Sequence, residues 1–143
     1  MLGLSACFWG DEQDTEHLMG RYYAVGNGPM LGESNWSNVH LYFDDEQFGL
    51  TEPILPDYVT AVFYHDSVLV AETGTLVLTE AEQYLADRQY YLVPVHPGDH
   101  SADAHQLVQG PFDWQTCLRK LRHQGLSSNL TDSARFVAIR AGR

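Results

Sequence analysis

The sequence predicts an α+β fold, in which a mainly antiparallel β-sheet carries one amphipathic helix at about residues 113–124. Short runs rich in Val, Tyr and Phe, separated by turn residues, indicate several strands. Two of these runs flank His65 and Asp66 closely enough to form a hairpin. A segment near the end of the chain instead repeats its apolar residues with the period of a helix. Because strands dominate this order, one helix covering an antiparallel sheet is the favoured arrangement.

The first half of the chain contains the early strands. Residues 21–25 form a short aromatic run, and in residues 38–43 apolar residues alternate with polar ones, which indicates a half-buried strand. The acidic run at residues 44–47 is expected to be a solvated turn. The prolines within residues 51–56 argue against a central strand there.

The strongest strand signal lies at residues 58–72, where two apolar runs flank a tight turn. Further on, the Thr and Glu of residues 79–82 match a helix capping box, so a short surface helix is expected over residues 79–88. Residues 90–95 read as another strand, and the proline within it suggests an edge or a bulge.

The helix at residues 113–124 has both of its end signals. Asp113 is a suitable N-cap, and Gly125 lies where a C-cap glycine is expected. One apolar stripe is expected to face the core: Trp114, Cys117, Leu118 and Leu121. Cys117 is therefore predicted to be a buried thiol, unpaired if Cys7 carries a lipid; the alternative is a disulfide between Cys7 and Cys117. Residues 134–139 read as the last strand.

The chain of 143 residues has a formal net charge of −11, and its charges are unevenly placed. Arg21 and Arg88 are the only Lys or Arg residues before residue 119. The other basic residues follow: Arg119, Lys120, Arg122, Arg135, Arg140 and Arg143. An acidic body repels nucleic acid, so that class of partner is excluded, and a basic protein is the better match.

Leu4, Ser5, Ala6 and Cys7 match the lipobox of a bacterial lipoprotein. This reading divides the chain into a truncated signal remnant at residues 1–6, a lipidated acidic tether at residues 7–19 and a single α+β domain at residues 20–143. The rest of the signal is then expected upstream of Met1. The alternative is a chance match within a loosely packed terminus.

The order of several segments along the chain resembles that in a family of small uncharacterised bacterial lipoproteins. The matching features are the lipobox, the hairpin at residues 58–71, the Tyr-Tyr strand at residues 90–95 and the helix that starts at Gly110–Asp113. The resemblance implies a location in the cell envelope and a small α+β fold. It brings no activity and no functional residues.

The densest group of potential metal ligands lies at residues 96–105. Its candidates are His96, Asp99, His100, Asp103 and His105. Neutral imidazoles and carboxylates suit Zn²⁺, Cu²⁺ or Ni²⁺, but Pro97 and Gly98 predict a loop rather than a helix. The competing interpretation is a solvated loop without a metal.

The sequence therefore predicts a non-enzymatic, lipid-anchored envelope protein that faces the periplasm or the exterior. The lipid on Cys7 would hold it on the membrane, and it would need no cofactor. Two alternatives remain: a metal-binding lipoprotein that uses the His96–His105 loop, and an acidic immunity or inhibitor protein that masks a basic toxin or enzyme. Some aromatic residues belong either to a binding surface or to the core edges: Trp9, Trp36, Tyr42, Tyr58 and Tyr64.

Overall fold

The structure, a computed structural model, describes residues 14–27, 37–127, 130 and 132–136. Antiparallel strands dominate it and two helices accompany them, which confirms the α+β prediction. The elements are β1 (Asp14–Met19), β2 (Tyr22–Asn27), β3 (Ser37–Phe43), β4 (Val59–Tyr64), β5 (Val68–Leu78), β6 (Gln83–Pro94), α2 (Ser101–Leu107), β7 (Gln109–Phe112), α3 (Trp114–His123) and β8 (Asp132–Arg135).

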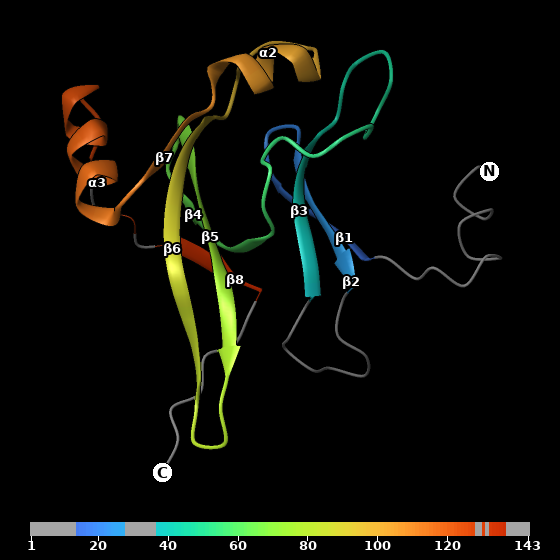
Figure 1. Cartoon of the computed structure of the whole chain (residues 1–143). Helices are drawn as coiled ribbons and strands as arrows, with labels where there is room; N and C mark the ends of the chain where they lie inside the picture. Colours follow the sequence, from blue (N-terminus) through green and yellow to red (C-terminus); the bar gives the residue numbers. More distant parts are fainter. Residues whose placement is uncertain (1–13, 28–36, 128–129, 131, 137–143) are drawn as a thin grey trace, which may run out of the picture.

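These elements form three layers (Figure 1). A three-stranded sheet, in the order β1-β2-β3, packs on one face of a five-stranded sheet in the order β7-β6-β5-β4-β8. Helix α3 covers the opposite face of the larger sheet, and α2 lies at one end of it. The larger sheet is therefore covered on both faces, as its apolar central strands require.

The core between the two sheets follows from the alternation in β3. Val39, Leu41 and Phe43 are buried there and pack against β5 residues such as Leu69. This confirms the half-buried strand. The Tyr22 hydroxyl donates a hydrogen bond to the Pro94 carbonyl oxygen at 2.7 Å, which ties the two sheets together, and burial raises the pKa of this tyrosine.

The second core lies beneath α3, where the predicted caps and apolar stripe are present. The Asp113 carboxylate accepts a hydrogen bond from the Thr116 N–H at 2.7 Å, and Gly125 ends the helix with a φ of +76°. Cys117 and Leu121 are fully buried. Burial raises the pKa of the free Cys117 thiol to about 11, so the predicted buried, unpaired cysteine is confirmed.

The helix predicted at residues 79–88 is wrong, because this segment is the turn and returning strand of a long β5–β6 hairpin. The Thr79 hydroxyl accepts hydrogen bonds from the N–H groups of Ala81 and Glu82, at 3.3 and 3.0 Å. A helix N-cap would make the same local bonds. Here the Thr79 N–H also donates to the Glu82 carbonyl at 2.9 Å, which closes a turn between two strands.

The loop predicted at residues 96–105 is only partly present, since Ser101–Leu107 form α2. The Asp103 carboxylate accepts from the His100 N–H at 3.3 Å, and Ala104 is buried in the core between the sheets. These contacts supply the N-terminal bond and the apolar anchor that the segment needs to be helical.

The boundaries at the two ends also change. Asp14–Met19 form β1 rather than part of a tether, because they pair with β2 and Met19 packs against the core. The last strand, Asp132–Arg135, begins two residues earlier than predicted and pairs with β4, while residues 137–139 of the predicted strand lie outside the described residues. Cys7 and the rest of residues 1–13 lie outside the described residues.

Candidate functional site

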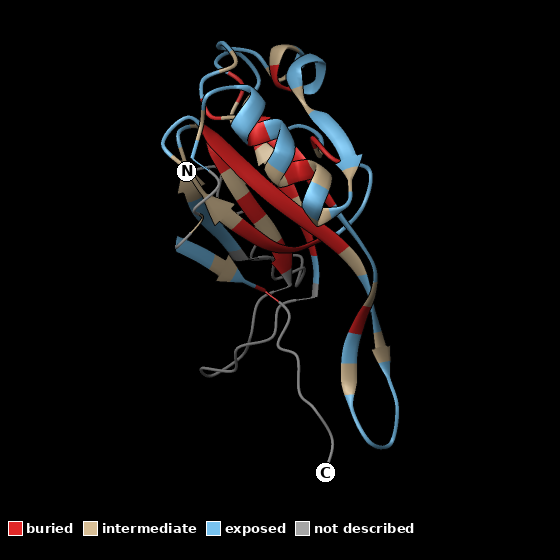
Figure 2. Ribbon diagram, turned by 90° about the vertical axis from the view of Figure 1, so that its left-hand side faces the viewer, coloured by how far each residue is buried: buried red, intermediate tan, exposed pale blue. Residues whose placement is uncertain are grey.

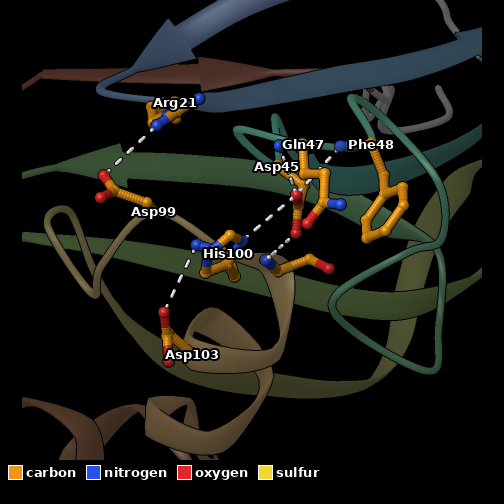
Figure 3. Close-up of polar contacts among 8 residues, drawn as sticks. Arg21, Asp45, Gln47, Phe48, Asp99, His100 and Asp103 are labelled. Atoms are coloured by element: carbon orange, nitrogen blue, oxygen red, sulfur yellow. Dashed lines mark hydrogen bonds and ion pairs between the residues drawn. The ribbon is translucent and has the colours of Figure 1, made fainter.

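The loop after β3 contains a buried carboxylate, Asp45, which is only 4% exposed (Figure 3). It accepts hydrogen bonds from the backbone N–H groups of Gln47, Phe48 and Ser101, at 2.8, 3.0 and 2.8 Å. These donors hold the pKa of Asp45 well below its usual range, the Ser101 N–H most strongly. The acidic run is therefore not simply a solvated turn: Asp45 joins it to the start of α2.

The predicted metal ligands are spread over different partners. His100 Nδ1 lies 3.4 Å from Asp45, and His105 Nε2 lies 3.3 Å from Glu52. Asp99 pairs with Arg21 at 3.5 Å, Asp103 caps α2, and His96 is exposed. Among the residues that the structure describes, no group of three or more His, Cys, Asp or Glu side chains is placed to hold a metal ion.

A second buried carboxylate, Glu72, lies at the centre of the larger sheet and is 1% exposed. Arg135 donates two hydrogen bonds to it, at 3.0 and 3.4 Å. The hydroxyls of Tyr90 and Thr60 donate at 2.9 and 2.8 Å, and Arg88 lies 4.0 Å away. Since its oxygens already accept these donors, Glu72 acts as a structural anion in the sheet.

Sequence reasoning missed Glu72, although one signal was present. The residue ends the otherwise apolar run Val68–Ala71, and a charge in such a strand needs a partner. Its main partner, Arg135, is far along the chain in β8, so only the fold brings the two together.

Several exposed apolar side chains lie on the part of the β5–β6 hairpin that projects beyond the body, residues 75–86, here called the arm (Figures 1 and 2). Leu78 is 64% exposed, and Leu76 and Tyr84 are exposed as well. None of these side chains belongs to either core cluster. A projecting apolar element of this kind is typical of an interaction site.

Both edges of the arm are free of strand partners within the described part of the chain. β4 pairs with β5 no further than Thr73, and β7 pairs with β6 only from Tyr90 onward. Between these limits the two strands pair only with each other, from Thr75 with Ala86 to Leu78 with Gln83. The arm therefore offers open backbone edges as well as apolar side chains.

Acidic side chains border the arm. Glu80 and Glu82 lie at its turn and Asp87 at its root, and all of them are exposed. Arg88, the nearest base along the chain, lies close to Glu72. The arm thus combines an apolar surface with a negative border.

Comparison with protein-family models, with curated proteins and with solved structures finds no match to this chain. In the described residues, none of the helices has the length and apolar character that crossing a membrane requires.

Proposed function

We propose that this protein is a non-enzymatic, lipid-anchored binding module of the cell envelope, and that its arm holds a basic protein partner. The projecting arm, with its exposed Leu76, Leu78 and Tyr84, is the observation that carries the binding role. The lipobox that ends at Cys7 supports the anchor, together with the resemblance to small bacterial lipoproteins.

The shape of the arm favours a binding role over a purely structural one. A two-stranded hairpin is marginally stable by itself in water, and exposed leucines add no stability to the body. A partner that covers the Leu, Val and Tyr side chains would supply the missing burial. The open strand edges would give it backbone hydrogen bonds as well.

Charge decides what kind of partner suits the arm. The chain has a net charge of −11, and Glu80 and Glu82 stand at the end of the arm. A second copy of the chain would bring like charges together, and nucleic acid or an anionic membrane would be repelled. A basic protein would be attracted, and its association rate would fall as salt is added.

The arm can be tested with a random peptide library selected against the purified protein. We expect the enriched peptides to combine apolar residues with Lys or Arg. They should bind the Leu78→Ser/Tyr84→Ser variant about tenfold more weakly or worse. The matched control is Phe48→Ser/Leu50→Ser, which removes exposed apolar side chains from a different loop and should leave binding unchanged.

Several outcomes would contradict the proposal. Peptides that bind the arm variant as well as they bind the original chain would exclude the arm as the site. Enrichment of neutral or acidic peptides would exclude a basic partner. Light scattering that shows a dimer, lost in the arm variant, would assign the arm to self-association instead.

The anchor has an independent test. Mass spectrometry of the protein isolated from its source cells should find Cys7 as the first residue, carrying a diacylglycerol thioether. An unmodified Cys7 that still follows Leu4, Ser5 and Ala6 would contradict the anchor. This result would leave the role of the arm untouched.

A further inference from the structure

A pocket of about 270 Å³ lies at the root of the arm, where β5 and β6 leave the body of the sheet. Asp57 and Tyr58 line it from the segment before β4. Thr73 lines it from β5, and Asp87 and Gln89 line it from β6. The pocket therefore joins three segments of the chain.

An irregularity in the β5–β6 ladder forms one wall of this pocket. Thr73 pairs with Gln89 and Thr75 with Ala86, so Gly74 faces two residues of β6. One of these, Asp87, has a φ of +54°, a left-handed conformation that Asp and Asn tolerate better than most residues. A side chain at Gly74 would approach the Ala86 carbonyl oxygen at 3.2 Å, so the two strands are closely spaced here.

The polar groups of the pocket are available to a ligand. Thr73 is only 2% exposed, and strand alternation places its side chain on the pocket face, the same face as Ala71 and Leu69. In the part of the chain that the structure describes, the Thr73 hydroxyl has no hydrogen-bond partner, and neither Asp57 nor Asp87 has a cation within ion-pair distance. The Thr73 oxygen is not one of the fully buried side-chain atoms without a partner, so it is open to the pocket and can contact a polar ligand.

The size and charge of the pocket define the ligand. Its volume is below the roughly 300–1,000 Å³ of typical small-molecule sites, so a single side chain fits better than a cofactor. Two carboxylates favour a cation. The Tyr58 ring contacts His40, with the ring centroids 4.6 Å apart, and is 50% exposed, so its exposed part can contact a guanidinium.

We infer that this pocket binds a basic side chain, preferably arginine, from the protein partner; this inference rests on the proposed function. The carboxylates of Asp57 and Asp87 would pair with the guanidinium, and the Thr73 hydroxyl oxygen would accept a hydrogen bond from one of its N–H groups. In the pairing of β5 with β6, Val77 and Tyr84 lie on the same face of the arm as Thr75, which lines the pocket. A partner segment along this face would thus contact apolar side chains next to its arginine.

The test is an NMR titration of the isotope-labelled protein with N-acetylarginine amide, which requires no partner. We expect saturable shifts of the amides of residues 73–75 and 87–89. N-acetylcitrulline amide, the neutral analogue, should bind about tenfold more weakly or worse, since it lacks the charge. Asp57→Asn/Asp87→Asn and Thr73→Val should each weaken arginine binding, and Asn at position 87 preserves the left-handed backbone.

The matched control is Asp66→Asn, which removes an exposed carboxylate at the opposite end of the β4–β5 hairpin and should leave binding unchanged. Equal binding of arginine and citrulline, shifts elsewhere only, or no effect of the double Asn variant would overturn the inference. The Leu78→Ser/Tyr84→Ser variant should still bind arginine amide. Failure of the titration is therefore distinguishable from failure of the arm to bind peptides.

Discussion

Two buried carboxylates, Glu72 and Asp45, are stabilised in different ways. Glu72 is paired with the guanidinium of Arg135 and receives two hydroxyl donors. Asp45 receives backbone N–H groups from its own loop and from the start of α2. In both cases the ionised form is satisfied, which is the condition for keeping a charge inside a protein.

Glu72→Gln should destabilise the protein, because it leaves Arg135 half buried without its anion. Urea unfolding at neutral pH should show a loss of about 2–4 kcal/mol. The control Glu82→Gln, at the exposed end of the arm, should change the free energy of unfolding by less than about 0.5 kcal/mol. Equal effects of the two substitutions would show that the Glu72 cluster contributes nothing specific.

Asp45 should make stability depend on pH in the acid range. Its pKa is lowered in the folded state, so its contribution is fully present above the unfolded-state pKa of about 3.9 and is lost as pH falls toward the lower folded-state value. Asp45→Asn should lower stability at neutral pH and flatten the decline below about pH 4. Urea unfolding across this range measures both effects.

The control for this experiment is Glu46→Gln, which changes an exposed carboxylate beside Asp45. It should leave the acid-range decline unchanged. A decline in Asp45→Asn as steep as in the original chain would mean that other carboxylates account for the acid sensitivity.

The arm and α3 differ in how well the sequence predicts them. For α3, the capping residues and the apolar stripe in the sequence predict the observed helix, because Trp114, Cys117 and Leu121 all face the second core. For the arm, Thr79 and Glu82 match a capping box, and the same hydroxyl bonds close a hairpin turn instead. Local patterns cannot separate these outcomes, since pairing with the preceding strand decides between them.

The candidate site was largely beyond the reach of sequence patterns. The sequence marks Tyr58 as an aromatic residue of either a binding surface or the core edge, and the structure places it at the pocket. No sequence pattern distinguishes Asp57, Thr73 and Asp87, because only the pairing of β5 with β4 and β6 brings them together. The composition of the His-rich segment suggests a metal site, yet His100 lies beside Asp45 and His105 beside Glu52.

Shortening the arm should leave the body intact. Thr75 and Ala86 are paired across the ladder, so replacing residues 76–85 with Asn-Gly creates a two-residue hairpin turn. Leu85 is the one buried apolar residue of the arm and it belongs to neither core cluster, so the free energy of unfolding should fall by no more than about 2 kcal/mol. Binding of the selected basic peptides should be lost.

Urea unfolding and peptide titration of the shortened chain check both parts of this prediction. A chain that no longer folds would show that the arm supports the body. A folded chain that still binds the peptides would place the binding surface elsewhere.

The whole molecule combines a covered sheet with one uncovered extension. The five-stranded sheet is covered by the β1–β3 sheet on one face and by α3 on the other, while the arm extends past both (Figures 1 and 2). The negative charge of the chain would draw a basic partner toward this extension from a distance. The apolar arm and the pocket at its root would then hold the partner at short range.

Photo-crosslinking in the source cells tests the central claim most directly. A photoreactive phenylalanine analogue placed at Leu78 should crosslink to one basic protein, with a yield that falls as salt is added to the lysed cells. The same group at Phe48, on another exposed loop, should not crosslink to that protein. Equal crosslinking from both positions, an acidic partner, or no crosslink at Leu78 would contradict the assignment of the arm as the binding element.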